Sequence, residues 1–598
     1  MSLTSREVLY PQTTALLSTK IWRKMTKLST APKPNRTSTY IAAVILIVII
    51  VAGVGYYFYQ SSMVPPTATT EMTTAMTTPM TTAMTTGPQY KNTIVIGTTD
   101  SVQTTLDPAD AYDYFAGSLV MVNLGGGLVD YRPGTTEIVP NLATDWSVTP
   151  DSMTWTFNLR HGVKFADGTP FDATVMKYSM DRQMAIDEPE GPFAGVSLDT
   201  LINKTVVTGT YQVQFVLNQP FSAFLAMAAF EPLWPVNPNI AVKQGDHFPV
   251  INYTGNVNTE VPNDIGPYML SNWQRTAGKD VEMDFVPNPN WWNASSGYPL
   301  KNIIYKFYSD STTLNLAMQS GDIDIAYRQL APTDIQSYQS NPNFKVWVGP
   351  GTFIQYLSFN ELQKPFGDVN IRRAIAAAID RNLIANTVFL GQVIPLYSMI
   401  PAGMSYHQDV FKRYGDANIT YATQLLQAAG YSASNPLKFT LTYPTGHYGS
   451  TDGIASALKQ ALEKTGMIQV TLASEPWANY RASTAADQLQ VYIYGWYPDF
   501  IDPYDYTYPF LPPDGIGTAH QHYVSATMTQ YLHTAAGNTD PNAFPKIYGQ
   551  IQDLIATDVP MVPLFQGTTI GVSKPAVGGI VFDATLYFRM YLLYETTS

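Results

Sequence analysis

At 598 residues with 45% hydrophobic side chains, the chain is long enough to form several domains. It contains no cysteine, which excludes disulfide bonds, thiolate chemistry, cysteine-ligated zinc and a lipid-modified N-terminal cysteine. The formal net charge is −12, although residues 1–89 hold seven Lys and Arg against Glu7 and Glu71, so the remainder is strongly acidic. An acidic body argues against nucleic acid as a partner.

Charged residues make up only 13% of the chain, roughly half of the usual share of about 25%. Neutral polar groups replace them, with 39 Tyr and 43 Pro. One interpretation is an acidic exterior, where carboxylates are partly protonated and dense charge is less useful. The other is drift in composition within the lineage, and the sequence leaves both open.

A transmembrane helix is predicted at residues 40–59, which read YIAAVILIVIIVAGVGYYFY. At 1.5 Å rise per residue, about twenty uncharged residues span a hydrocarbon core of roughly 30 Å. The alternative is a buried helix of a soluble domain. A segment that is apolar on every face and has an aromatic cluster at one end is more typical of a membrane interface.

The basic residues around this helix predict its orientation. Six Lys and Arg lie between Lys20 and Arg36, and no basic residue follows the helix until Lys91. Because basic residues favour the cytoplasmic side, residues 1–39 are predicted to be cytoplasmic and the large C-terminal body extracytoplasmic. No small-x-small cleavage site follows the helix, so we expect a single-pass membrane anchor.

Residues 60–89 are rich in Thr, Met and Pro and include the tandem units MTTA, MTTP, MTTA and MTTG at Met72–Gly87. Almost nothing in this composition can form a core. We expect a disordered stalk that keeps the body near the membrane and raises its local concentration there. A plain linker is physically nearly the same, and the sequence does not separate the two.

The body shows alternating strand and helix patterns with Pro and Gly between them. Strands are predicted at residues 92–97 (NTIVIG), 154–159 (TWTFNL) and 212–217 (QVQFVL). Amphipathic helices are predicted at residues 368–389, with the first aspartate as N-cap, and at residues 453–465. This order favours α/β lobes over a β-sandwich or a helical bundle.

Six blocks of sequence follow one another through the body. The first, residues 124–182, contains LVDY, then VPNLATDW, then TWTFNLRHGVKFADGTPFDA. The others are GPYMLSNW at Gly266–Trp273, SGDIDIA at Ser320–Ala326, LSFNELQKPFGDVNIRRAIAAAIDR at Leu357–Arg381, GWYPDFIDPYD at Gly495–Asp505 and DVPMVPLF at Asp558–Phe565. In this order they resemble the family 5 extracellular solute-binding proteins of ABC transporters, the oligopeptide-, dipeptide- and nickel-binding group, here archaeal-type with an N-terminal membrane anchor.

The resemblance implies an α/β, periplasmic-binding-protein-like fold of type II in its large three-domain variant. Two lobes then close around a ligand cleft by a hinge motion. The expected domains are a cytoplasmic N-terminus at 1–39, the transmembrane helix at 40–59, the stalk at 60–89, lobe I at 90–130, 256–349 and 561–598, a small second domain at 131–255, and lobe II at 350–560.

The resemblance also implies the ligand-binding residues. In peptide-binding members, an aspartate matching Asp499 pairs with the N-terminal ammonium of the ligand, and a tryptophan matching Trp496 borders a side-chain pocket. Tyr497 and Pro498 lie between them and are included in the predicted site. From the residues alone, an aspartate in such an acidic, Pro-rich loop is by default a turn or capping residue.

A di- or oligopeptide is the expected ligand, delivered to two permease and two ATPase subunits of an ABC importer. An oligosaccharide is the alternative within the same family, because aromatic residues make up 13% of the chain and suit sugar rings. Nickel is less favoured, because the seven histidines form no cluster beyond His520 and His522, whose spacing is more typical of a strand or loop surface.

Catalysis is not predicted. The chain lacks the HExxH, GxSxG and GxxxxGK[ST] motifs, and carboxylates alone do not identify a hydrolase. A secreted hydrolase and a surface-layer protein remain as alternatives from other classes, but neither explains the six blocks. We therefore expect a binding protein that uses no cofactor and no metal.

Overall fold

The computed structural model describes residues 89–102, 105–187, 193, 198–241, 264–295, 301–445, 447–512 and 520–597. The predicted cytoplasmic segment, the membrane helix at 40–59 and all but the last residue of the stalk lie outside these residues. Within the part that the structure describes, no helix is long and apolar enough to cross a bilayer. The chain divides into the units Met1–Thr85 and Thr86–Ser598, and every described element belongs to the second unit.

The first half of an eleven-stranded sheet is built around β2 (Thr93–Thr98), which confirms the strand predicted at residues 92–97. This β-branched strand pairs in parallel with β11 and β12, as a strand covered on both faces does. The remaining elements of this half are β9 (Tyr268–Thr276), β10 (Lys279–Pro287), β11 (Asn302–Phe307), β12 (Ile325–Tyr327), α9 (Ser311–Ser320) and α10 (Pro332–Gln339).

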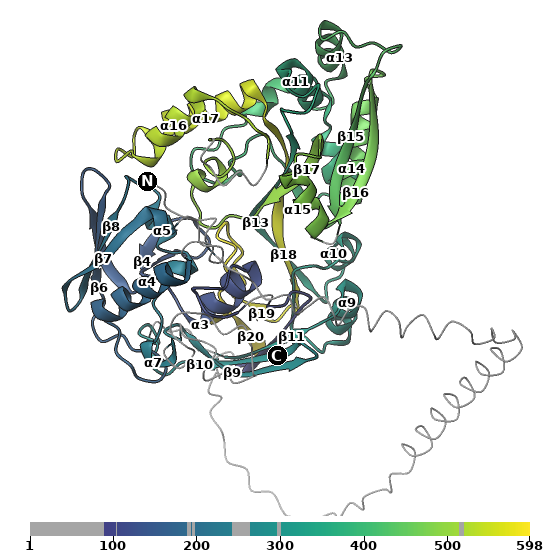
Figure 1. Cartoon of the computed structure of the whole chain (residues 1–598). Coiled ribbons are helices and arrows are strands. Elements are labelled where there is room, and N and C mark those ends of the chain that lie inside the picture. Colours follow the sequence, from purple (N-terminus) through teal and green to yellow (C-terminus); the bar gives the residue numbers. More distant parts are fainter. Residues whose placement is uncertain are drawn as a thin grey trace, which may run out of the picture. The chain divides into compact units, whose positions relative to one another are not determined.

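Two long strands join this half to the rest of the sheet. β13 (Lys345–Phe359) and β18 (Met561–Ser573) pair antiparallel and run through the middle of the body (Figure 1). The end of β18 pairs with β12, and the end of β13 pairs with β17 (Val491–Trp496), so the two long strands connect these neighbours within one sheet. The register of the pair shifts between Pro350 and Ile354, so the ladder is irregular at its centre, where a strand bends and twists more easily.

Beyond β17 the sheet continues in parallel through β15 (Leu437–Thr445) and β16 (Ile468–Pro476). α14 (Thr451–Glu463) lies against these two strands (Figure 1) and confirms the helix predicted at residues 453–465. The other elements of this half are α11 (Val369–Ala378), α12 (Arg381–Leu383), β14 (Val393–Pro395), α13 (Ile419–Ala428), α15 (Trp477–Ala485), α16 (Ala526–Ala536) and α17 (Phe544–Asp558).

The long helix predicted at residues 368–389 is only partly confirmed. Its first residue caps α11 as predicted, because the Asp368 carboxylate accepts a hydrogen bond from the backbone N–H of Asn370 at 2.9 Å. One continuous helix is wrong, however, since α11 ends at Ala378 and Ile379 is extended with ψ 136°. Asp380 then caps α12, and the π-helix η5 (Ile384–Val388) follows.

The break has a physical reason in Arg381, which is fully buried. Its Nε donates to the carbonyls of Leu396 and Pro563 at 2.8 and 2.9 Å, and Nη1 pairs with Asp416 at 2.9 Å. A buried guanidinium needs such partners, and the change of chain direction before it lets it reach them.

A separate four-stranded antiparallel sheet has the order β5-β6-β8-β7. β6 (Thr154–Leu159) and β8 (Gln212–Leu217) coincide with two predicted strands, and their buried residues alternate as predicted. β5 (Ala143–Val148), β7 (Ile202–Gly209), α4 (Ala173–Asp187) and α5 (Leu198–Leu201) complete this part. Smaller sheets pair β3 (Val129–Tyr131) with β4 (Ile138–Pro140), and β1 (Gln89–Tyr90) and β19 (Val577–Gly578) with β20 (Tyr594–Thr597).

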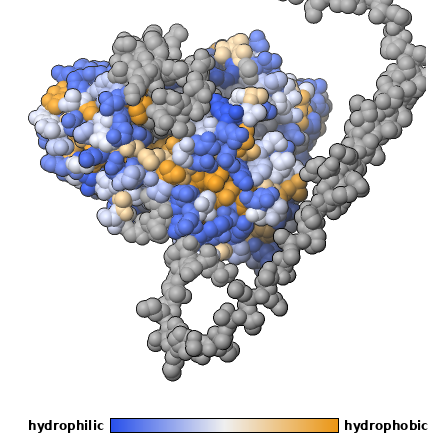
Figure 2. Space-filling model, turned by 90° about the horizontal axis from the view of Figure 1, so that it is seen from below, coloured by the Kyte–Doolittle hydropathy of each residue, from blue (hydrophilic) through white to orange (hydrophobic). Residues whose placement is uncertain are grey.

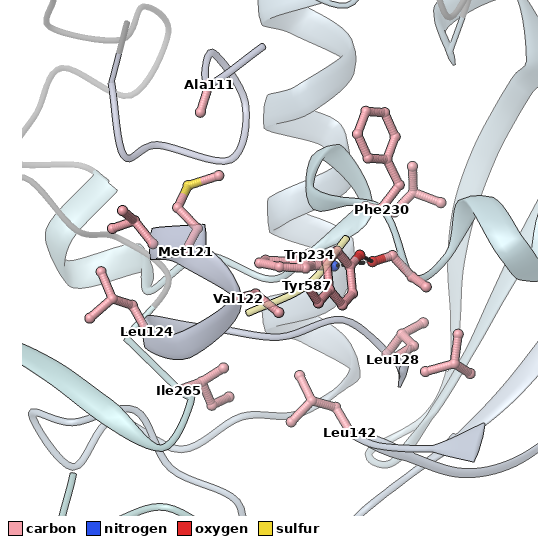
Figure 3. Packing of buried hydrophobic residues seen from close by; sticks show 14 of the residues in the cluster. Ala111, Met121, Val122, Leu124, Leu128, Leu142, Phe230, Trp234, Ile265 and Tyr587 are labelled. Carbon is pink, nitrogen blue, oxygen red and sulfur yellow. Dashed lines mark hydrogen bonds between the residues drawn. The ribbon is translucent and has the colours of Figure 1, made fainter. Parts of the chain in front are cut away.

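The hydrophobic interior forms two large clusters. One combines side chains between Ile94 and Tyr327 with Phe500 and with side chains from Val577 to Leu593, and Figure 3 shows a part of it around Trp234 and Tyr587. The other contains side chains between residues 354 and 565. Two cores in one unit are what a two-lobed protein requires, while the predicted domain boundaries stay a prediction.

The surface is mostly polar but not uniformly so. On the face drawn in Figure 2, a band of hydrophobic residues runs between hydrophilic areas. Apolar atoms contribute more than half of a typical protein surface, so such a band does not by itself mark a binding site. The most exposed large hydrophobic side chains among the described residues are Val524, Leu362, Val348 and Leu316.

Candidate functional site

A cavity of about 550 Å³ is lined by segments that lie far apart in the sequence. β17, the loop after it and α15 form one part of the lining, and residues 112–118, 226–231 and 585–587 form another. The volume lies in the range of about 300–1,000 Å³ that is usual for small-ligand sites. The lining is rich in aromatic side chains and contains the charged residues Asp113, Glu231, Arg481 and Asp499.

The loop after β17 is held by a neighbouring aspartate. Trp496 Nε1 and the backbone N–H of Asp499 both donate to Oδ2 of Asp505, at 3.1 and 2.9 Å. Asp502 caps the short 3-10 helix η7 (Pro503–Tyr506) by accepting from the N–H of Tyr504 at 2.8 Å. Asp502 and Asp505 therefore accept the hydrogen bonds that cap and stabilise this acidic loop. The side chain of Asp499 is not needed for that role and lines the cavity.

The Asp499 carboxylate accepts a hydrogen bond from the hydroxyl of Tyr112 at 2.8 Å. Among the described residues, no Lys, Arg or His forms an ion pair with it. Burial raises the pKa of Asp499 to about 7, and the Tyr112 hydrogen bond opposes this rise. The carboxylate is thus partly desolvated, faces the cavity and has no cation of the described residues beside it.

Tyr497 and Pro498 extend the aromatic lining. The ring of Tyr497 stacks on Phe353 with 4.3 Å between centroids and lies 5.2 Å from the ring of Tyr114. The guanidinium of Arg328 lies 4.4 Å from the Tyr114 ring centroid, a cation–π contact that fixes this ring. These contacts hold Tyr497 as a rigid surface, and Pro498 restricts the backbone beside it.

Glu231 begins the 3-10 helix η3 (Glu231–Leu233) and also lines the cavity. The carbonyl of Ala229 accepts hydrogen bonds from Trp234 Nε1 at 2.9 Å and from the Tyr587 hydroxyl at 3.0 Å, which hold this segment (Figure 3). Burial, with a smaller contribution from the charges of Asp499 and Asp113, raises the pKa of Glu231 to about 8.

The part of the lining around α15 is basic. His447 stacks on Trp477 with 3.7 Å between centroids, and Arg481 and His520 line the cavity as well. Burial lowers the pKa of His447 and of His520, so both imidazoles are neutral at neutral pH. Arg481 carries the permanent positive charge of the lining and forms no ion pair within the described part of the chain.

The four residues predicted from the sequence, Trp496, Tyr497, Pro498 and Asp499, all line this one cavity. That they contact a ligand stays a prediction. Sequence reasoning missed Tyr112, Glu231, His447, Trp477 and Arg481, which have no local motif and meet only in the fold. It noted His520 but assigned it to a strand or loop surface, not to the site. The one available signal was the segment LDPADAYD at Leu106–Asp113, which contains Tyr112.

The two histidines noted in the sequence have different surroundings. His520 lines the cavity, whereas His522 forms a hydrogen bond with Asp487. Both have positive φ, 44° and 56°, in a loop and not in a strand. Among the residues that the structure describes, no three His, Cys, Asp or Glu side chains are grouped as a metal ion would need.

Comparison with known proteins identifies the family. The family of bacterial extracellular solute-binding proteins, family 5 Middle, matches residues 137–518. The "Probable D,D-dipeptide-binding periplasmic protein DdpA" of Escherichia coli (strain K12) is 28% identical over 507 residues, which cover 83% of this chain and 92% of that protein. Heme-binding protein A of Haemophilus influenzae is 24% identical over 487 residues, which cover 78% and 85%. These names give different ligands, so the ligand of this chain has to be argued from its cavity.

Solved structures show the same fold. The murein tripeptide-binding protein MppA in its unliganded open form has a TM-score of 0.72 at 23% identity and covers 86% of this chain and 98% of its own. The complex of Haemophilus influenzae OppA with RPPGFSPFR has a TM-score of 0.67 at 24% identity and covers 86% and 100%. The prediction of an α/β, type II periplasmic-binding-protein-like fold is thereby confirmed for the body.

The family match spans more than half of the chain and includes most of the first sequence block and all of the next four, among them the loop that carries Asp499. The cavity contains aromatic and charged side chains in a volume suited to a small ligand. The chain therefore belongs to the family 5 bacterial extracellular solute-binding proteins, the substrate-binding subunits of ABC importers, which bind a solute and are not enzymes.

Proposed function

We propose that this protein captures di- and oligopeptides in the cavity and delivers them to the permease and ATPase subunits of an ABC importer. The observation that carries the proposal is the cavity-facing carboxylate of Asp499, which has a hydroxyl but no cation beside it within the described residues. The N-terminal ammonium of a peptide supplies that cation through charge-assisted hydrogen bonds. Because every peptide with a free N-terminus has this group, Asp499 orients the ligand without selecting its sequence.

Trp496, Tyr497 and Pro498 would then border the first side chain of the peptide with apolar surface. An aromatic wall also suits an oligosaccharide, which is the competing ligand. A neutral sugar, however, would bring no cation to the carboxyl groups of Asp499 and Glu231, whose ionised forms burial makes costly, whereas a positive group would stabilise those forms. The charges of the cavity therefore favour a ligand with a positive group.

Ligand capture would proceed by closure of two lobes around this cavity. We assign residues 90–130, 256–349 and 561–598 to lobe I, residues 131–255 to the small second domain and residues 350–560 to lobe II. β13 crosses the boundary assigned between residues 349 and 350, and β18, assigned to lobe I, pairs with β13 on both sides of it. The register shift of the pair begins at Pro350, next to this boundary. An irregular ladder resists bending less than a regular one, which supports a hinge at this place.

Residues 40–59 and the stalk at 60–89 would tether the body outside the membrane and near the importer. Deletion of residues 1–59 is expected to move the protein from the membrane fraction to the soluble fraction of the cell, because the deletion removes the helix that would export and tether the body, as an immunoblot of the fractions will show. Retention of the shortened chain in the membrane fraction would contradict the anchor.

The peptide assignment is tested by thermal-shift screening of the full chain against di- to pentapeptides and against cello- and malto-oligosaccharides. A ligand at 100 times its dissociation constant adds about 2.7 kcal/mol to the stability. Asp499→Asn is expected to weaken peptide binding by about 2–5 kcal/mol, because the ammonium loses its counter-charge. A response to sugars alone would contradict the peptide assignment.

Asp502→Asn is the matched control for Asp499→Asn. It replaces a carboxylate by an amide three residues away from Asp499. The side-chain oxygen of asparagine can still accept the hydrogen bond from the backbone N–H of Tyr504, so the cap of η7 is retained. The control is expected to bind peptide as the unchanged protein does. Equal peptide affinity in all three proteins would rule out Asp499 as the ammonium anchor.

A further inference from the structure

Glu231 is a second carboxylate in the cavity, and its environment differs from that of Asp499. Its side chain is only 6% exposed, yet it belongs to the cavity lining. Within the described part of the chain, the backbone N–H of Glu231 itself donates to this carboxylate, and no other residue forms a hydrogen bond or ion pair with it. A carboxylate that is buried to this extent normally has a partner, because its desolvation is otherwise uncompensated.

The fold holds this carboxylate in place. Gly117, in the π-helix η1 (Phe115–Met121), leaves room for it, since a Cβ at this position would lie 2.2 Å from Oε1 of Glu231. Trp234 and Tyr587 fix the carbonyl of Ala229 two residues earlier. Glu231 is therefore positioned against the cavity from a fixed backbone, and no cation from the described residues compensates its charge, so a ligand in the cavity can supply one.

The charges of the lining indicate what that partner is. Asp113 accepts a hydrogen bond from the backbone N–H of Phe115 at 3.0 Å, and Asp499 accepts one from Tyr112. A peptide with neutral side chains brings one ammonium and one carboxylate, which match Asp499 and the cation of Arg481. It offers nothing that stabilises the ionised form of Glu231, which burial keeps protonated in the empty cavity by raising its pKa to about 8. A ligand with one additional cation would stabilise that ionised form and so complements the lining better.

We propose that Glu231 and Asp499 together form a two-carboxylate subsite that selects peptides with Lys or Arg as the first residue. The N-terminal ammonium binds Asp499, and the basic side chain of the same residue binds Glu231. The aliphatic stem of that side chain lies along the aromatic lining, as such stems do on apolar surfaces. The inference rests on the proposed function, because it takes Asp499 as the ammonium anchor.

The test compares Lys-Ala-Ala with norleucine-Ala-Ala, which has nearly the same shape but lacks the second cation. Isothermal titration of the full chain is expected to give at least tenfold tighter binding of the lysine peptide. In Glu231→Gln this preference disappears, while the norleucine peptide still binds, which also shows that the variant is folded. Glu282→Gln on β10, outside the cavity lining, removes the same charge and keeps the preference.

Gly117→Ala is a second variant that keeps every charge but forces the Glu231 carboxylate to move. It is expected to reduce the preference for the lysine peptide as well. Equal affinity of the unchanged protein for both peptides, or a preference that survives in Glu231→Gln, overturns the inference and leaves the proposed function standing. Binding of neither peptide by the unchanged protein overturns both.

Discussion

Tyr112 and Asp499 stand 387 positions apart in the sequence, yet a hydrogen bond of 2.8 Å joins their side chains. The hydroxyl donates to one oxygen of the carboxylate and so stabilises its charged form, while burial raises the pKa of Asp499 to about 7. A carboxylate has a second oxygen, which remains for a ligand ammonium. Tyr112 therefore favours the charged form of Asp499 against the effect of burial.

Tyr112→Phe is expected to weaken peptide binding about tenfold at pH 7, because a hydrogen bond to a charged group contributes about 1.5–3 kcal/mol. Without the hydroxyl, the pKa of Asp499 rises further, and the proton has to leave before the ammonium binds. The ionised form exists above the pKa and is lost as the pH falls through it. Dissociation constants measured from pH 9 down to pH 5 are expected to show that affinity falls as the pH falls, and that this fall begins at a higher pH in the variant than in the unchanged protein.

Tyr114→Phe is the control for this change. Its hydroxyl lies 3.4 Å from the carbonyl of Leu586 and does not contact Asp499. The control is therefore expected to keep the pH profile of the unchanged protein. If the profile of Tyr112→Phe also overlaps that of the unchanged protein, the hydroxyl does not control the charge of Asp499.

The predictable part of the site is the part that is contiguous in the chain. Trp496 to Asp499 follow one strand and carry a recognisable motif, so the sequence predicts them as a group. Glu231 and Tyr112 reach the cavity from other segments, where they stand among ordinary residues. What distinguishes Glu231 is burial without a cation beside it among the described residues, and this property exists only once the chain has folded.

At the scale of elements, the β13–β18 pair is the connection between the two halves of the main sheet. At its irregular centre, Gly351 approaches the facing strand so closely that a Cβ would lie 2.7 Å from the carbonyl oxygen of Gly567. The atom in the way belongs to the backbone and cannot rotate aside. Glycine at this position therefore permits the close crossing of the two strands.

Gly351→Ala is expected to destabilise the body by about 1–3 kcal/mol, because the added methyl group forces the two strands apart. Calorimetric melting of the full chain measures the effect. Gly449→Ala is the control, since a Cβ there meets no atom within 4 Å, and its melting temperature should stay the same. Equal melting of both variants would show that the crossing tolerates a side chain.

Sequence patterns predicted the local elements better than their connections. The alternation of polar and apolar side chains predicted both ends of β6 and β8 correctly, because one face of each strand is buried. The helix predicted at residues 368–389 breaks at Ile379, where tertiary contacts of Arg381 outweigh the local helical pattern. Which strands pair in the main sheet is determined by residues far apart in sequence, and no local pattern contains that information.

At the scale of the whole molecule, the described acidic residues differ in how burial affects them. Burial is the main cause of a raised pKa in one group, which reaches about 6 in Asp110 and Asp502, about 7 in Asp264, Glu361 and Asp499, and about 8 in Glu231. Asp324 differs, because hydrogen bonds from two lysines lower its pKa although its burial acts in the opposite direction. Among the described residues, buried carboxyl groups with a raised pKa outnumber buried ones with a lowered pKa. Between about pH 4 and pH 8 the folded body therefore keeps protons that the unfolded chain has released.

The sign of the resulting pH dependence follows from these shifts. Between the unfolded pKa values of about 4 and the folded values of 6 to 8, the folded state binds more protons, so its stability falls as the pH rises. Below about pH 4, ion pairs such as that of Asp324 begin to lose their charge, and stability falls again. We expect the melting temperature of the full chain to be highest near pH 4–5 and to decline toward pH 8.

Calorimetric scans at unit steps from pH 3 to 9 measure this profile, with Asp499→Asn as an internal check. Asparagine cannot ionise, so the variant is expected to lose less stability than the unchanged protein between pH 5 and 8, by an amount on the order of 1 kcal/mol. A maximum in acid would favour the interpretation of the low charge content as adaptation to an acidic exterior. A maximum at pH 7 or above would contradict it, because the raised pKa values would then have no effect on the folded state.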